Sequence, residues 1–228
     1  MKIKNALRSL SKFEIALWLV SLVVVFTSYV LSPDKDALSI VFSLIGVTAL
    51  IFVSKGMVLG QVLSVVFAVG YAIISFSYKY YGEMFTYVFL TAPSAIAAII
   101  SWIKNPYKET EVVEVADLTP KKTALVFALG ISVSIGFYFL LGALDTANLI
   151  ISTVSVLTSF IASAFTYLRS PYYAIADSLN DVVLITMWIL ATVERPAYLP
   201  MIFCFLMFLV NDLYGFVNWK RLKKEQNK

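Results

Sequence analysis

Long apolar stretches alternate along this chain with short polar segments. Each of eight stretches is close to the ~20 residues that an α-helix needs to cross about 30 Å of hydrocarbon. They run from Phe13 to Leu31, Leu38 to Val53, Val58 to Tyr78, Met84 to Ile103, Thr123 to Leu144, Ala147 to Tyr167, Tyr173 to Val193, and Tyr198 to Trp219. The sequence lacks the short alternating strands of a membrane β-barrel, so the pattern predicts an all-α integral membrane protein with eight transmembrane helices.

Composition agrees with this prediction. Hydrophobic residues make up 60% of the chain and charged residues 14%, whereas soluble domains carry about 25% charged residues. Mean hydropathy is +0.85. The loops are too short for a second domain, and the longest, residues 105–122, is expected to be a solvated linker with Pro near each end. Function must therefore lie among the helices.

The basic residues predict the orientation of the chain. With the N-terminus placed inside, fifteen of the 18 Lys and Arg residues lie on the inner side, and only Lys35, Lys79 and Arg195 lie outside. The positive-inside rule then predicts that both termini are cytoplasmic. We attribute the net charge of +4 to this topology and to contact with anionic lipid, and we expect no nucleic-acid partner.

The residue inventory excludes several kinds of chemistry. The chain has no His and a single Cys, Cys204, which lies inside the last apolar stretch. The commonest general base and metal ligand are therefore missing, and so is any disulfide framework. An intramembrane enzyme is disfavoured because no nucleophile has an evident base, and we expect neither a metal nor a cofactor. The first stretch is longer than a signal-peptide core of about 7–15 residues and is predicted to be retained.

A weak internal repeat divides the chain. Segment 101–104 (SWIK) resembles 218–221 (NWKR), and segment 43–48 (SLIGVT) corresponds to 152–157 (STVSVL). One stretch separates two sets of three, so both sets enter the membrane in the same direction, as parallel repeats do. The alternative is that each Trp is an ordinary interfacial anchor followed by inner-side Lys.

The predicted organisation is one peripheral helix followed by a 3+1+3 core. Its parts are a peripheral transmembrane helix in 1–34, a first three-helix repeat in 35–104, a linker and linker helix in 105–146, a second repeat in 147–221, and a basic cytoplasmic tail in 222–228.

Polar side chains inside the apolar stretches are the candidate functional residues. Asp at the centre of a membrane helix costs about 2.5–3.5 kcal/mol, so it usually faces a cavity or a partner. Asp177, Asn180 and Asp181 are spaced three and four apart and share one helix face, and Trp188 follows Asp181 by seven residues on the same stripe. The residues predicted to bind a solute are Gln61, Tyr87, Ser94, Asp177, Asn180, Asp181, Trp188, Asn211, Asp212 and Tyr214.

Some of these positions have a second interpretation. Asp177 lies one turn from its helix start and could face cytoplasmic water, and Gln61 could hydrogen-bond between helices. Glu83 begins the fourth stretch and is expected to stabilise a helix N-terminus. Pro93, within the same stretch, is expected to permit a kink.

The positions of the basic residues along the chain indicate which kind of solute the expected site would bind. No Lys or Arg lies near the middle of any stretch, and a buried phosphate site would need such residues or a glycine-rich nest. Carboxylates can accept hydrogen bonds from sugar hydroxyls, and aromatic faces can stack on a flat ring or a cation. The expected solute is neutral or cationic.

With these residues in view, the chain resembles the PnuC family of bacterial vitamin transporters, whose best-known members carry nicotinamide riboside. The resemblance is carried by 43–47 (SLIGV), Gly60-Gln61, 80–83 (YYGE), Pro93, Trp102, 169–173 (RSPYY), Asn180-Asp181 and 211–219 (NDLYGFVNW). It implies a core like that of SWEET sugar facilitators and a homotrimer in the bacterial inner membrane. It also implies a site between the two halves and facilitated diffusion, with a cytoplasmic kinase trapping the solute.

The chain departs from this family at positions near the expected site. Relatives often have Gln and Asn where this chain has Tyr87 and Ser94, an Asn shortly after the position of Gln61, and a Trp-rich stretch where this chain has 172–176 (YYAIA). These differences leave the substrate open, because related transporters are associated with thiamine, riboflavin or deoxynucleosides. We expect a uniporter for nicotinamide riboside. The alternatives are a proton- or cation-coupled importer of another vitamin or nucleoside and a structural or receptor-like membrane protein.

Overall fold

A computed structural model describes residues 3–33, 37–77, 80–146, 148–194 and 196–228. Its elements are α1 (Ile3–Arg8), α2 (Lys12–Leu31), α3 (Ala37–Ser54), α4 (Val58–Ser77), α5 (Tyr81–Thr86), the π-helix η1 (Tyr87–Thr91), α6 (Ala92–Lys104), α7 (Pro120–Ala143), α8 (Leu149–Tyr167), α9 (Tyr173–Glu194), the 3₁₀ turn η2 (Pro196–Tyr198) and α10 (Leu199–Gln226). Eight spans in the described part of the chain are long and apolar enough to cross a membrane, with α5, η1 and α6 forming one of them. The predicted all-helical architecture is confirmed.

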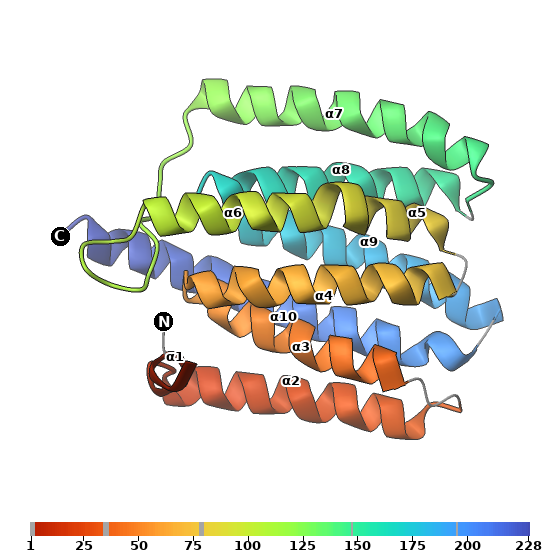
Figure 1. The fold of residues 1–228 in the computed structure, drawn as a ribbon, viewed down its shortest axis with the longest axis horizontal. Coiled ribbons are helices and arrows are strands. Elements are labelled where there is room, and N and C mark those ends of the chain that lie inside the picture. The colour runs from red at the N-terminus through yellow and green to blue at the C-terminus, as the bar shows by residue number, and fades with distance from the viewer. Residues whose placement is uncertain (1–2, 34–36, 78–79, 147, 195) are drawn as a thin grey trace.

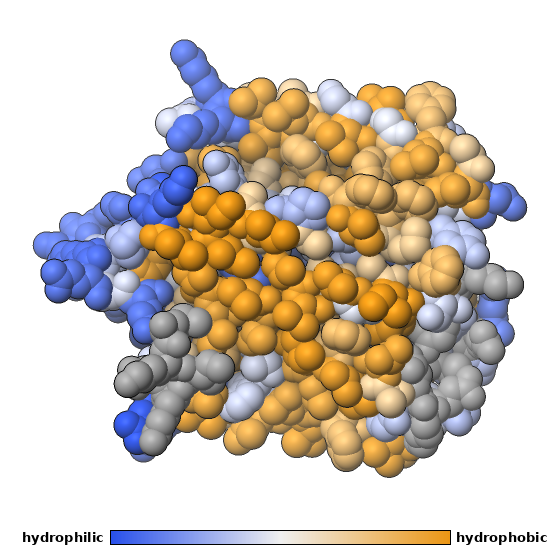
Figure 2. Space-filling view, in the orientation of Figure 1, coloured by the Kyte–Doolittle hydropathy of each residue, from blue (hydrophilic) through white to orange (hydrophobic). Residues whose placement is uncertain are grey.

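The long helices lie side by side, and each runs opposite to the one before it (Figure 1). Both termini lie at one end of the bundle. This end, which we call the basic end, holds the starts of α2, α4, α7 and α9 and the ends of α3, α6, α8 and α10. Figure 2 shows a broad hydrophobic band around the middle of the molecule and hydrophilic residues gathered at the basic end. Large apolar side chains of the edge helices, such as Val23 and Phe139, are exposed, as expected of a surface that faces lipid.

Two helices lie at opposite edges of the bundle (Figure 1). α2 packs against α3 and α10, and α7 packs against α8. The six remaining spans form two sets of three, α3, α4 and α5–α6, then α8, α9 and α10. Helices at matching positions in the two sets run in the same direction.

Polar residues tie α2 to the six-helix core. Ser11 caps its N-terminus in a capping box with Glu14, whose backbone N–H lies 3.2 Å from the Ser11 Oγ. The Glu14 carboxylate also forms an ion pair with Lys55 at 3.0 Å and accepts a hydrogen bond from Tyr214 Oη at 2.9 Å. Because Glu14 is buried, these partners offset much of the cost of desolvating its charge.

The fourth span widens before its proline. The sequence predicts a kink at Pro93, and the structure places the irregularity one turn earlier, in η1, where the Ala92 N–H donates to the Tyr87 carbonyl. A π-turn absorbs one extra residue, and Pro93 then occupies the first turn of α6, where its missing N–H breaks no helical bond.

Most of the long linker is exposed, as expected of a solvated segment, but one part of it is packed against the bundle. The Val113 side chain is 1% exposed and packs among buried residues of the basic end. Backbone bonds join Val113 N to Gly56 O and Ala116 N to Arg169 O, each at 2.9 Å. We call residues 112–118 the strap. Buried backbone groups need hydrogen-bond partners, and the strap bonds to the α3–α4 and α8–α9 turns. The sequence alone could not predict that these turns lie beside the strap.

Candidate functional site

A cavity lies between the two sets of three helices. Its described lining consists of Leu50 and Val53 (α3), Gln61, Ser64 and Phe67 (α4), Tyr87 and Thr91 (η1), Ser94 and Ala95 (α6), Ser159, Ser163 and Thr166 (α8), Asp177, Asn180, Asp181 and Leu184 (α9), and Phe205, Phe208 and Asp212 (α10). All six core spans contribute, and among these residues none belongs to α2 or α7.

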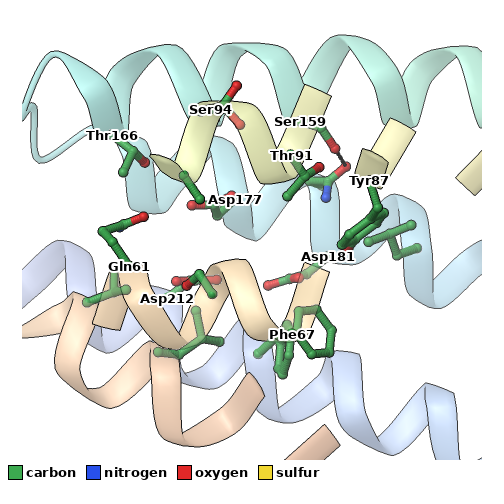
Figure 3. A pocket seen from close by; sticks show the side chains of 18 of the residues that line it. Gln61, Phe67, Tyr87, Thr91, Ser94, Ser159, Thr166, Asp177, Asp181 and Asp212 are labelled. Atoms are coloured by element: carbon green, nitrogen blue, oxygen red, sulfur yellow. Dashed lines mark hydrogen bonds between the residues drawn. The ribbon is translucent and has the colours of Figure 1, made fainter. Parts of the chain in front are cut away.

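Three carboxylates define the electrostatic character of the cavity. Asp177 and Asp181 project from α9 and Asp212 from α10, and Figure 3 shows all three around an open space with Gln61. Asp181 and Asp212 are each 3% exposed, and one carboxylate oxygen of Asp181 has no hydrogen-bond partner among the described residues. The described lining contains no Lys or Arg that would balance these groups. The cavity is therefore built to receive positive charge or hydrogen-bond donors.

Asn180 is held by hydroxyl groups of the neighbouring helix α8. Its Oδ1 lies 3.0 Å from Ser159 Oγ (Figure 3), 2.8 Å from Thr158 Oγ1 and 3.4 Å from Ser155 Oγ. These contacts occupy the amide oxygen and leave the amide NH₂ as a donor. In a cavity rich in carboxylates, this NH₂ group can donate a hydrogen bond to an acceptor atom of the solute.

Gln61 reaches the cavity because α3 and α4 approach closely beside it. A Cβ at Gly60 would lie 2.3 Å from the Val53 backbone nitrogen, so only glycine permits this spacing. Gln61 itself is buried and faces the carboxylates in Figure 3.

An aromatic layer closes the cavity toward the end of the bundle opposite the basic end. It consists of Tyr71, Tyr87, Trp188, Tyr198 and Phe205. Tyr87 lines the cavity and its ring lies 4.3 Å from that of Tyr71, whose hydroxyl accepts a hydrogen bond from Trp188 Nε1 at 3.0 Å. Trp188 in turn packs edge-on against Tyr198 at 5.5 Å.

Trp102 and Trp219, which we call the tryptophan pair, lie on the side of the cavity toward the basic end, seven residues past the lining residues Ala95 and Asp212 of their own helices. Their ring centroids lie 5.4 Å apart, and both side chains are buried. Trp219 Nε1 donates to the Val53 carbonyl at 2.9 Å and Trp102 Nε1 to the Thr166 carbonyl at 3.0 Å. Since Val53 and Thr166 line the cavity, the pair is hydrogen-bonded to the backbone of two lining residues.

Seven of the ten residues predicted to bind a solute come together in this lining. They are Gln61, Tyr87, Ser94, Asp177, Asn180, Asp181 and Asp212. Asp177 is half-buried and belongs to the cavity rather than to the helix end alone.

Three predicted residues lie outside the described lining. Trp188 belongs to the aromatic layer, one ring behind Tyr87. Asn211 donates to Ser21 Oγ at 3.0 Å and Tyr214 to Glu14, so both bind α2. Sequence periodicity could not distinguish these contacts from solute contacts, because the partners lie about 200 residues earlier in the chain.

The sequence prediction did not include five Ser and Thr residues of the described lining. Ser64 lies three residues after Gln61, Thr91 lies three before Ser94, and Ser159, Ser163 and Thr166 are spaced four and three apart along α8. Helical spacing of Ser and Thr in a transmembrane segment was the available signal. It is a weak one, because such hydroxyls commonly bond to carbonyls of their own helix, as Thr166 does to Ala162 at 2.9 Å.

Six described spans around a polar cavity, in a chain whose described part has eight spans able to cross a membrane, are the architecture of a multi-pass membrane transporter rather than an enzyme. The chain matches the model of the nicotinamide mononucleotide transporter family over residues 36–221, and it belongs to this family.

Relatives with known names support the same assignment. The chain is 28% identical to the nicotinamide riboside transporter PnuC of Neisseria mucosa over 208 residues, which cover 87% of this chain and 77% of the relative. It is 26% identical to PnuC of Haemophilus influenzae, covering 94% of this chain and 92% of that one. Among solved structures, a crystal structure of the vitamin B3 transporter PnuC matches with a TM-score of 0.83 at 25% identity, covering 96% of this chain and 94% of that chain.

Proposed function

We propose that this protein carries nicotinamide riboside across the bacterial inner membrane by facilitated diffusion. The single observation that carries the choice of substrate is the cavity with three carboxylates and, in its described lining, no Lys or Arg. The relatives are named as riboside transporters, whereas the family model is named for the mononucleotide, so the charge of the site has to decide between the two.

The two molecules differ by one phosphate group. Nicotinamide riboside carries a positive pyridinium ring, and the mononucleotide adds a phosphate with about −1.5 to −2 charges. Inside a membrane that phosphate would require Arg, Lys or a nest of N–H groups. Beside Asp177, Asp181 and Asp212 it would be repelled, while the pyridinium ring would be attracted. The riboside is therefore the better fit.

Each lining group has a role in this proposal. The three Asp residues attract the ring and accept hydrogen bonds from ribose hydroxyls, Asn180, Gln61 and Ser94 bind the polar edges, and Tyr87 stacks on the ring. The rest of the proposed arrangement is a SWEET-like pair of parallel repeats with cytoplasmic termini, assembled as a homotrimer. The parallel repeats are supported by the contribution of both three-helix sets to the cavity, nine residues from the first and ten from the second. The cytoplasmic termini are supported by the collection of basic residues at the end where both termini lie.

Binding measurements on purified protein test the substrate. We expect nicotinamide riboside to raise the thermal unfolding temperature and the mononucleotide to leave it unchanged, because only a ligand of the folded state stabilises it. Asp181→Asn keeps the shape and removes the charge, and it should weaken riboside binding about tenfold or more, as loss of a hydrogen bond to a charged group costs about 1.5–3 kcal/mol. Equal binding of the mononucleotide would contradict the proposal. Thiamine, also a cation, is the appropriate competitor.

Glu83 favours a second candidate, a proton- or cation-coupled importer. It lies in the first turn of α5, is 2% exposed, and neither carboxylate oxygen has a hydrogen-bond partner among the described residues. The expected role of Glu83 at the N-terminus of α5 does not require this burial, and a uniporter gives the group no role in transport. Uptake into proteoliposomes that depends on an imposed pH gradient, and loses this dependence in Glu83→Gln, would support coupling; uptake driven by the riboside gradient alone would support the uniporter.

A further inference from the structure

The tryptophan pair joins the two three-helix sets by crossed hydrogen bonds. Trp102 ends the first set and donates to a carbonyl at the end of α8, the first helix of the second set. Trp219 lies near the end of the second set and donates to a carbonyl at the end of α3, the first helix of the first set. The two contacts are thus equivalent under exchange of the sets.

The residues before each Trp repeat this crossing. Ser101 Oγ donates to the Tyr167 carbonyl and Asn218 Nδ2 to the Ser54 carbonyl, both at 2.8 Å. The last turns of α3 and α8 leave carbonyl groups without helical partners, and the side chains of the opposite set bind these groups. Four hydrogen bonds therefore connect helix ends that belong to different sets.

The position of the pair makes these bonds an obstacle to the solute. The two indole rings, with Tyr173 edge-on against Trp219 at 4.8 Å, lie between the cavity and the basic end. A solute that left the cavity between the ends of the two sets would have to separate these rings. Because each indole is bonded to the backbone of the other set, the rings can part only if the ends of the helices part as well.

On the basis of the function proposed above, we propose that Trp102 and Trp219 form the gate of the transporter at the basic end and that the strap is its latch. The strap crosses between the sets at this point. Its bond to Gly56 fixes it to the α3–α4 turn of the first set, and its bond to Arg169 fixes it to the α8–α9 turn of the second. Gate opening must bend or release it.

The end of α10 completes the latch. Gln226 Nε2 donates to the Val113 carbonyl at 3.0 Å, and the Val115 N–H donates to Gln226 Oε1 at 2.8 Å. Lys223 forms an ion pair with Asp117. The Gln226 amide thus binds the backbone of the strap as a neighbouring β-strand would. Gln226 lies seven residues beyond Trp219. Removing it should loosen the gate without altering the cavity or the spans.

Accessibility of a cavity cysteine tests the proposal. Cys204→Ser removes the natural thiol, and Ser163→Cys then places one probe in the lining. In vesicles that expose the basic end, Gln226→Ala should speed labelling by a membrane-impermeant maleimide about fivefold or more, the change expected from a lost hydrogen bond. Trp102→Phe with Trp219→Phe should speed it further. Labelling from the other side of the membrane should not change.

Controls separate gating from unfolding and from the choice of substrate. Trp18→Phe also removes an indole donor, in this case the one that joins Trp18 of α2 to Thr48 of α3. This variant should leave labelling unchanged. Unchanged labelling from the basic end in folded Gln226→Ala and in the double Trp variant would overturn the proposal, as would equal acceleration from both sides. The assay needs no solute. Protection of the cysteine at position 163 by nicotinamide riboside, in the variant that keeps Gln226 and both Trp residues, therefore tests the proposed function separately.

Discussion

Aromatic groups lie on both sides of the cavity along the bundle, and they are held in different ways. In the aromatic layer, rings contact rings, and the hydrogen bond from Trp188 joins two side chains. At the basic end, both indole N–H groups bind backbone carbonyls at helix ends, and the strap adds backbone bonds of its own. One closure depends on side-chain packing and the other on the positions of helix ends.

This difference indicates how each closure can open. Side chains change rotamer without disturbing helical hydrogen bonds, so the aromatic layer can rearrange ring by ring. The tryptophan pair cannot move in this way, because its acceptors are part of the backbone of α3 and α8. Opening there requires the two three-helix sets to rotate apart, which is the motion expected of parallel repeats around a fixed site.

The largest effect is expected from removing the centre of the aromatic layer. Trp188 is fully buried, and Trp188→Ala should cost about 3–5 kcal/mol of folding stability, since a large core side chain leaves a cavity behind. Unfolding in detergent measures this loss. Trp18→Ala is the matched control, because the Trp18 ring is half-buried at the edge of the bundle and should cost clearly less. Equal losses would show that the layer is not packed as described.

The spans themselves follow from the sequence, but the closures do not. Apolar length fixes each helix within a few residues, because no other structure satisfies the backbone in lipid. The polar extension of α10 beyond Trp219 was missed, since nothing local requires it. It is stabilised by the contacts of Gln226 with a strap that lies more than a hundred residues earlier.

The site was predictable where one helix carries it. Asp177, Asn180 and Asp181 lie on one face of α9 by spacing alone, and the structure brings all three to the cavity. Asn211 and Asp212 are neighbours in sequence, and only the arrangement of helices shows that one binds α2 while the other lines the cavity. The spacing of residues along the sequence predicts which side chains share one face of a helix. It does not predict which other helix that face packs against.

A smaller effect is expected where α3 and α4 meet at the basic end. Gly60→Ala would force a Cβ against the Val53 backbone, and such overpacking costs about 1–3 kcal/mol. Because the Val53 carbonyl accepts the bond from Trp219, the displacement should also speed labelling of the cavity cysteine from the basic end.

Gly136→Ala is the control for this change. Among the described residues, no atom outside its own helix lies within 4 Å of a Cβ at this position of α7, so the variant should be as stable as wild type or, by helix propensity, up to about 1 kcal/mol more stable. Labelling should not respond to it. If Gly60→Ala behaved like Gly136→Ala, close contact between α3 and α4 would not be what positions the acceptor of Trp219.

The smallest effect is expected from a single oxygen in the aromatic layer. Tyr71→Phe keeps the ring and removes only the acceptor of the Trp188 N–H, which leaves a buried donor unpaired at a cost of about 1 kcal/mol. If side-chain packing alone closes this end, the cavity cysteine should become more reactive from the opposite side of the membrane and remain unchanged from the basic end. Faster labelling from the basic end would mean that the two closures are coupled through the bundle, because a change confined to ring contacts would then have reached helix ends about 20 Å away, the rise of the helix from Tyr71 to the start of α4.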